Sequence, residues 1–160
     1  MADLDELDQA LLRELQHDAR RTNRELAAAT GVSPSTSLER VRSLRERGVI
    51  RGFLVDLDLE EVGRPVQALI SVRVRPPSRV NIEAFREWAA RLPETVGVFV
   101  VAGGEDFLIH VAVPDNKFLY AFVIDRLTQR PEVADVRTSV VYEHIRSPII
   151  DPATPARPRH

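Results

Sequence analysis

Apolar residues near the start of the chain repeat at intervals of three and four, which places them on one face of a helix. This stripe consists of Leu4, Leu7, Leu11 and Leu15. Acidic residues fill the first turn, where the positive end of a helix favours negative charge. They are Asp3, Asp5 and Glu6. The pattern predicts a helix over residues 3–17.

Two further helical segments follow, and each carries its own start and stop signals. Thr22 and Glu25 have the spacing of a capping box, which predicts a helix over 23–30. A third helix is predicted to begin after Ser33 and to end at Gly48, because serine caps helices and glycine ends them. Two helices joined by a tight turn, behind a leading helix, are typical of a helix-turn-helix domain.

After the third helix the apolar residues alternate with a period of two. The stretch VIRGFLVDLDL, residues 49–59, has the pattern of a strand, and Gly63 with Pro65 then marks a linker. Beyond the linker, strand-like and helix-like stretches succeed one another. They are a strand over 66–74, a helix over 80–91, strands over 96–103 and 106–113, a helix over 115–129 and a strand over 133–145. This βαββαβ order is that of a ferredoxin-like unit.

These elements predict an α+β fold, with an N-terminal winged helix-turn-helix domain followed by a ferredoxin-like βαββαβ domain. The predicted boundaries are 1–52 for the helix-turn-helix domain, 53–65 for a strand and linker, and 66–146 for the ferredoxin-like domain. Residues 147–160 contain four prolines, and we expect this tail to be disordered.

Charge is distributed unevenly along a chain whose net charge is −2 at pH 7. Residues 1–18 hold one arginine and six acids, whereas residues 19–52 hold eight arginines and three acids. A basic stretch in a mildly acidic protein indicates a surface that faces an anion, or simply a solvated face. The absence of cysteine excludes disulfides and thiolate metal sites. No stretch has the length of a membrane span, and the acidic N-terminus is unlike a signal peptide, so we expect a cytoplasmic protein without a membrane partner.

The third helix carries the basic stretch, and its pattern suits a helix that enters a DNA groove. Leu38, Val41 and Leu44 are predicted to anchor its buried side. Small hydroxyl residues allow close approach to the duplex, and arginine binds guanine with two hydrogen bonds. The candidate DNA-contacting residues are Arg21, Arg24, Ser35, Thr36, Ser37, Arg40 and Arg47. The alternative is an ordinary surface helix whose serines cap and solvate it.

The first fifty residues resemble the N-terminal domain of the Lrp/AsnC family, the leucine-responsive, feast/famine transcriptional regulators. The resemblance rests on Leu4, Asp5 and Asp8, LLRELQ at 11–16, DAR at 18–20, ELA at 25–27, GVSPSTSLERVRSL at 31–44 and GVI at 48–50. It implies that Ser35, Thr36 and Arg40 contact double-stranded DNA, and that the βαββαβ half senses a ligand. It also implies a homodimer in which the 50–58 strand and the sheets pair between subunits, and assembly into tetramers or octamers.

A glycine-rich turn, within VVAGGEDFLIHV at 100–111, joins two predicted strands. From its pattern alone it is a hairpin whose glycines take positive φ. The family resemblance implies that this turn borders an amino-acid effector pocket, since Gly103 and Asp106 match a Gly-x-x-Asp signature. The candidate effector-binding residues are Gly103, Gly104, Asp106, Thr138 and Ser139. Ala102 and Phe107 depart from the family's usual residues and leave the effector's identity open.

We predict a regulator that is not an enzyme and needs no cofactor or metal, because no nucleophile, phosphate-binding or metal-ligand motif is present. Three alternatives stay open. One is an enzyme, since one branch that resembles this family decarboxylates a haem precursor. Another is an architectural protein that compacts DNA with little sequence preference. The third is a sensor whose DNA-binding half has decayed, against which the intact pattern at 31–44 argues.

Overall fold

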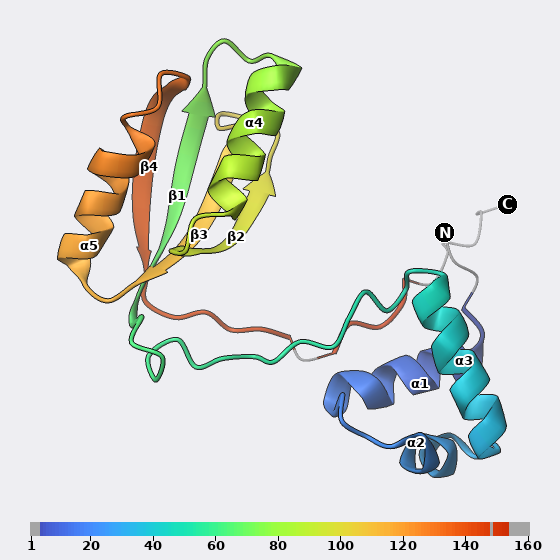
Figure 1. The fold of residues 1–160 in the computed structure, drawn as a ribbon. Helices are drawn as coiled ribbons and strands as arrows, with labels where there is room; N and C mark the ends of the chain where they lie inside the picture. Colours follow the sequence, from blue (N-terminus) through green and yellow to red (C-terminus); the bar gives the residue numbers. More distant parts are fainter. Residues whose placement is uncertain (1–3, 148, 154–160) are drawn as a thin grey trace, which may run out of the picture. The chain divides into compact units, whose positions relative to one another are not determined.

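The computed structural model describes residues 4–147 and 149–153, and the chain divides into two compact units (Figure 1). The first unit takes the chain up to Val55 together with the described residues from Ile145 onward. The second unit comprises Asp56–His144. Asp3, which we predicted in the first helical turn, lies outside the described residues.

Three helices form the first unit: α1 (Glu6–His17), α2 (Asn23–Thr30) and α3 (Pro34–Glu46). The predicted leucine stripe supplies its core, since Leu11 and Leu15 of α1 are buried against Leu26 of α2. Leu7, Val41 and Ile50 pack around this cluster. The helix-turn-helix arrangement predicted from the sequence is therefore confirmed.

The caps of these helices follow the sequence closely. The Thr22 hydroxyl accepts from the Glu25 N–H at 3.3 Å, and Glu25 Oε2 accepts from the Thr22 N–H at 2.7 Å. This backbone hydrogen bond lowers the pKa of Glu25 below its ordinary value. Gly31 then adopts a φ of +69°, the left-handed geometry in which α2 ends. Asn23 Nδ2 donates to the Pro34 carbonyl at 2.6 Å, which fixes α2 to the first turn of α3.

No strand forms among the described residues of the first unit, so the stretch 49–59, which alternates like a strand in the sequence, has no strand partner within the single chain. Residues 51–58 have irregular backbone, and Phe53, Leu54, Val55 and Leu57 are exposed. A strand is held by hydrogen bonds to a neighbouring strand, and alternation of residue types cannot supply that neighbour.

Four antiparallel strands and two helical segments form the second unit, and the predicted βαββαβ order is confirmed. The strands are β1 (Val66–Val74), β2 (Thr95–Val100), β3 (Phe107–Val113) and β4 (Val133–Val141), in the spatial order β2-β3-β1-β4. The helical segments are α4 (Arg79–Ala90) and α5 (Asn116–Ala121) with its π-helical continuation η1 (Phe122–Leu127).

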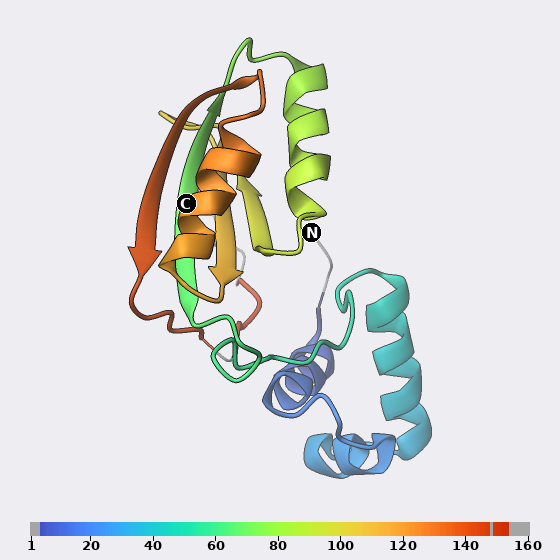
Figure 2. The ribbon, with the colours of Figure 1, turned by 60° about the vertical axis from the view of Figure 1, so that its left-hand side comes forward.

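The helical segments α4 and α5 cover one face of this sheet (Figure 2). Phe85 of α4 and Leu127 of η1 are fully buried against Ile70, Phe107 and Ile109 of the central strands. The ring centroids of Phe85 and Phe107 lie 4.8 Å apart. No helix of this unit packs on the opposite face, which we call the open face. Its residues in the four strands include Gln67, Leu69, Ser71, Phe99, Leu108, His110, Ser139 and Val141.

The second predicted helix of this unit, over 115–129, changes its geometry in the middle. Phe122 and Leu127 are both buried although they are five residues apart, a spacing that a regular α-helix would turn away from a common face. The Thr128 N–H donates to the Val123 carbonyl at 3.0 Å, which is an i to i+5 hydrogen bond. The π-helical turn therefore restores Leu127 to the core.

The described part of the tail contacts the first unit, and the disorder predicted for 147–160 as a whole stays a prediction. Asp151 forms an ion pair with Arg13 of α1 at 2.7 Å. Gln16 of α1 donates to the Ile150 carbonyl at 3.2 Å and accepts from its N–H at 2.8 Å. The two hydrogen bonds to one residue hold the backbone at 150 against α1. Residues 148 and 154–160 of the predicted tail lie outside the described residues.

Replacement of Phe107 by alanine should destabilise the second unit, because it removes a fully buried ring that packs on Phe85. We expect a loss of about 4 kcal/mol in the free energy of unfolding. Trp88 is the single tryptophan of the chain and contacts Phe85, so urea unfolding followed by its fluorescence reports this unit. Tyr120→Ala, at an exposed position of α5, is the matched control and should change stability by less than about 1 kcal/mol. Equal stability of the two variants would contradict this account of the core.

Candidate DNA-binding and effector sites

The side of α3 that faces the core differs from the prediction. Ser37 and Leu44 are fully buried and Val41 is half-buried, whereas Leu38 is 59% exposed. The prediction that Leu38 anchors the helix is therefore wrong, and Ser37, which we predicted to contact DNA, is buried within the domain. The small side chain of Ser37 occupies the buried position that the sequence pattern had assigned to Leu38.

A buried carboxylate explains this rotation of α3. Asp8 of α1 is 1% exposed, and a charged group out of water requires a partner of opposite charge. Arg40 Nη1 lies 3.3 Å from Asp8 Oδ1, and Arg47 Nη1 lies 3.1 Å from Asp8 Oδ2. Both arginines come from α3, so the side of α3 that carries them must face α1.

Asp5 completes this ionic cluster at the start of α1. Its carboxylate caps the helix by accepting from the Asp8 N–H at 2.8 Å, and it accepts from Arg40 Nη1 at 2.6 Å. The hydrogen bond from Asp8 lowers the pKa of Asp5, and Arg40 adds to the effect. The charges of Arg40 and Arg47 are thus met inside the domain, and their predicted role toward DNA stays untested.

Asp8 was missed as a site residue although the sequence held a signal for it. It falls at helical spacing between Leu4 and Leu11, and so on the apolar stripe itself. An acid at such a position becomes buried when the helix packs on its neighbours. Its charge then needs a cation from one of those helices.

The other predicted DNA-contacting residues lie in different surroundings. Arg21 pairs with Glu14 of α1 at 2.5 Å. Ser35 is exposed, and its hydroxyl lies 2.9 Å from that of Ser33. Thr36 is half-buried, and its N–H donates to the Ser33 cap at 3.1 Å. Arg24 of α2 is exposed and pairs with no acid that the structure describes.

The side of α3 turned to solvent, which we call the outer face, combines cations, a hydroxyl and one apolar side chain. Its exposed residues are Ser35, Leu38, Glu39, Arg42 and Arg45. Arg42 Nε donates to Glu46 Oε1 at 2.7 Å, which raises the pKa of the guanidinium. That exposed pair is weak and can exchange for another anion. Hydroxyl and guanidinium groups bind phosphates and base edges, and an apolar side chain contacts the methyl group of thymine.

The glycine-rich turn between β2 and β3 holds the predicted effector residues Gly103, Gly104 and Asp106. Gly103 has a φ of +139°, which other residues rarely adopt. The Gly104 carbonyl accepts from the Arg73 guanidinium. Asp106 Oδ2 accepts from the Val74 N–H at 2.8 Å and lies 3.5 Å from Arg75 Nη1. Asp106 is thus a structural acceptor that holds the turn against the end of β1.

Thr138 and Ser139 do not share one surface with each other. They are neighbours on β4, opposite Ile70 and Leu69 of β1, so their side chains point to opposite faces of the sheet. Arg137 reaches the turn instead and forms an ion pair with Glu105. The sequence reading missed this residue, because a sequence contains no sign of which strand will lie beside a turn.

Within residues 4–147 and 149–153, neither a metal cluster nor a membrane span is found. No cluster of three or more histidine and acidic side chains there could hold a metal ion. None of the helices there has both the length and the apolar character needed to cross a membrane.

Comparison with known proteins covers both units of the chain. Residues 4–45 match the AsnC-type helix-turn-helix domain, and residues 67–148 match the Lrp/AsnC ligand binding domain. The chain is 42% identical over 145 residues to the HTH-type transcriptional regulator AldR of Mycobacterium tuberculosis, covering 91% of this chain and 81% of that protein. It is 36% identical over 144 residues to the leucine-responsive regulatory protein of Rhizobium meliloti, covering 90% and 92%.

A solved structure resembles the chain over nearly its whole length. A transcriptional regulator of Neisseria meningitidis in complex with L-methionine superposes with a TM-score of 0.84 at 31% identity. The match covers 91% of this chain and 94% of that one.

Removal of the buried carboxylate should loosen the first unit, because Asp8→Ala leaves Arg40 and Arg47 without their shared partner. We expect a loss of about 3 kcal/mol in the stability of the helical unit. The measurement is urea unfolding followed by far-UV circular dichroism, while Trp88 fluorescence should show the second unit unchanged. Glu6→Ala, on the exposed side of the same helical turn, is the control and should cost less than about 1 kcal/mol. An Asp8→Ala protein as stable as the control would show that the ionic cluster does not hold α3 in place.

Proposed function

We propose, from the premise that this chain belongs to the Lrp/AsnC family of transcriptional regulators, that it reads double-stranded DNA through the outer face of α3 and responds to an amino acid. The chain is a regulator of that family, with a helix-turn-helix unit and a ligand-binding unit. The observation that supports this proposal most is the pattern of buried and exposed residues along α3. It separates the residues that hold the helix in the domain from those available to DNA.

The outer face suits the major groove in shape and in charge. Leu38, Glu39 and Arg42 occupy its centre, and Ser35 lies at the amino-terminal turn, whose N–H groups favour phosphate. Arg45 on α3 and Arg24 on α2 flank this centre and suit the phosphates of the duplex. We therefore assign sequence readout to Arg42 and Leu38, and assign Arg40 to holding α3 on α1.

The open face of the sheet suits a second copy of the chain, and we propose a homodimer through it. Phe99 is 57% exposed there, and Leu69, Leu108 and Val141 lie on the same face. An apolar sheet face of this kind is normally covered by another layer. A dimer presents two copies of α3, which fits a DNA site with two half-sites about 34 Å apart. Tetramers or octamers would be assemblies of such dimers.

The glycine-rich turn is the proposed effector site. Support comes from the relative of Neisseria meningitidis, whose structure contains L-methionine. Exposed N–H groups near Gly103 and Gly104 can donate to a carboxylate, and the Asp106 carboxylate can accept from an ammonium group. Asp106 has one oxygen, Oδ2, engaged with Val74, so we assign the ammonium to its other oxygen.

The proposal gives the chain no catalytic step, and a chromosomal DNA partner places it in the cytoplasm. An architectural role in DNA compaction is the alternative that the following experiment separates. It would leave little difference between a selected duplex and a random one.

Arg42→Ala should weaken binding to duplexes that the wild-type protein selects from a random pool. We expect a loss of about tenfold to a hundredfold, because one guanidinium contact to a base is removed. Fluorescence anisotropy at physiological salt measures the affinity for selected and for random duplexes. Arg86→Ala, an exposed arginine of α4 in the other unit, is the matched control and should bind as wild type does.

Two results would count against this assignment of α3. Near-normal affinity of the Arg42→Ala protein for the selected duplex would remove Arg42 from the reading face. Equal affinity of the wild-type protein for selected and random duplexes would favour the architectural role instead.

Asp106→Asn should remove the effector response without unfolding the turn, because an amide oxygen can still accept from the Val74 N–H. We expect affinity for the effector at this turn to fall by about tenfold or more, since the ammonium loses a charged partner. A thermal-shift screen against the twenty amino acids finds the effector, and calorimetry compares the two proteins. If Asp106→Asn responds as strongly as wild type, the turn is a hairpin and nothing more.

A further inference from the structure

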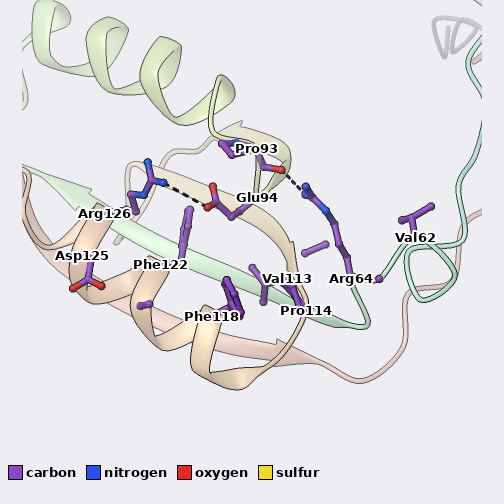
Figure 3. A pocket seen from close by; sticks show the side chains of 13 residues that line it. Val62, Arg64, Pro93, Glu94, Val113, Pro114, Phe118, Phe122, Asp125 and Arg126 are labelled. Atoms are coloured by element: carbon purple, nitrogen blue, oxygen red, sulfur yellow. Dashed lines mark hydrogen bonds and ion pairs between the residues drawn. The ribbon is translucent and has the colours of Figure 1, made fainter.

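A cavity lies in the ligand-binding unit (Figure 3). It is lined by none of the residues of the glycine-rich turn. Its volume is about 550 Å³, within the range of small-molecule sites. Its wall includes Arg64 before β1, Glu94 before β2, Val113 at the end of β3, and Phe118, Phe122 and Arg126 of α5 and η1. The glycine-rich turn precedes Phe107, at the other end of β3. Seven residues of strand separate the two places by about 20 Å, so they are different sites.

The carboxylate of Glu94 in the wall of this cavity has an oxygen without a hydrogen-bond donor among the described residues. Its Oε2 is buried and accepts no hydrogen bond from any residue that the structure describes. Its Oε1 lies 3.9 Å from Arg126 Nη2, too far for a hydrogen bond. The whole side chain is 25% exposed, so the cavity leads to it. A buried acceptor without a donor costs free energy, which a cationic N–H group would recover.

Two guanidinium groups lie at the same cavity with donors to spare. Arg126 points toward Glu94 in Figure 3, is 51% exposed, and has this long ion pair as its contact. Arg64 donates to the Pro93 carbonyl through Nη1, which leaves its remaining N–H groups available. A guanidinium carries five N–H donors and binds a carboxylate in fork geometry.

The rest of the wall is apolar. Val113, Phe118 and Phe122 line it, and Phe118 is largely exposed although it is a large ring. The carboxylate of Asp125 points away from these groups (Figure 3). The cavity therefore combines one acceptor for a cation, two donors for an anion and an apolar surface.

We propose that this cavity is a second small-molecule site, which takes an α-amino acid with an apolar side chain. The ligand's ammonium group donates to the Glu94 carboxylate, whose exposed part faces the cavity, and the ligand's carboxylate accepts from Arg126 and Arg64. The ligand's side chain packs on Phe118. A simple anion would leave Glu94 unsatisfied, and a simple amine would leave the guanidinium groups unused. The inference stands on this cavity and does not depend on binding at the glycine-rich turn.

Equilibrium dialysis of the full-length protein with labelled L-methionine, L-leucine and L-phenylalanine tests the site by counting ligands bound per chain. Glu94→Gln keeps the shape of the side chain and removes the charge that the ammonium requires. Glu87→Gln, an exposed glutamate of α4, is the matched control. Arg126→Gln tests the carboxylate partner, and circular dichroism with gel filtration checks that each variant keeps its fold and assembly.

We expect the cavity's affinity for at least one of the three amino acids to fall tenfold or more in Glu94→Gln and in Arg126→Gln, with no change in Glu87→Gln. Binding that Asp106→Asn abolishes and Glu94→Gln leaves intact would overturn the inference while supporting the proposed effector turn. Binding that Glu94→Gln weakens and Asp106→Asn spares would support the cavity and count against the turn. If none of the three amino acids binds the wild-type protein, or if both glutamate variants bind as wild type does, the cavity is not an amino-acid site.

Discussion

The carboxylate of Asp8 lies almost wholly out of water, and the guanidinium groups of Arg40 and Arg47 hold it there. A buried charge without partners is far more costly than an exposed one, so this contact restricts how α3 can lie on α1. Apolar packing alone would tolerate a rotation that buried Leu38. The ionic cluster does not, since it needs Arg40 and Arg47 on the inner side. The outer face is therefore a consequence of an interaction on the opposite side of the same helix.

Because some arginines of the first unit hold α3 on α1 and others face solvent, they differ in how well they suit DNA. Arginines in a DNA-binding helix look alike in a sequence, yet a guanidinium held by Asp5 and Asp8 has to break those contacts before it can meet a phosphate. Among the acids that the structure describes, Arg42 pairs with the exposed Glu46, whereas Arg45 and Arg24 pair with none. The energetic advantage lies with the second group, because exposed ion pairs contribute little and are readily exchanged.

Local features of the fold could be predicted from the sequence, whereas features that depend on distant neighbours could not. The capping box of Thr22 and Glu25 and the cap at Ser33 were both predicted, since each involves residues within a few positions. Strand β1 was predicted to the residue because its apolar and polar residues alternate throughout except at Leu69. The prediction of how α3 is oriented failed because Asp8 lies some thirty residues away from α3 in the sequence. The π-helical turn at Phe122–Leu127 was missed because the prediction assumed a periodicity of 3.6 residues. The candidate effector residues followed from resemblance, and the cavity at Glu94 was missed because its residues are scattered along the chain.

Two apolar surfaces remain that folding of one chain does not cover: the open face with Phe99 and Leu69, and the stretch at 53–57. A contact that follows two-fold symmetry brings the same patch of each copy together. A patch of one charge would then repel itself, whereas an apolar patch gains from the meeting in proportion to the area it buries. The backbone of the stretch at 53–57 is also not paired in a sheet. Its alternating residues form no strand within one chain, but they suit a strand that pairs with a second copy. If both surfaces are used in this way, association supplies stability that the single chain lacks, and the folded regulator depends on its own concentration. Two-fold symmetry in the DNA site would then follow from the same self-association that completes the fold.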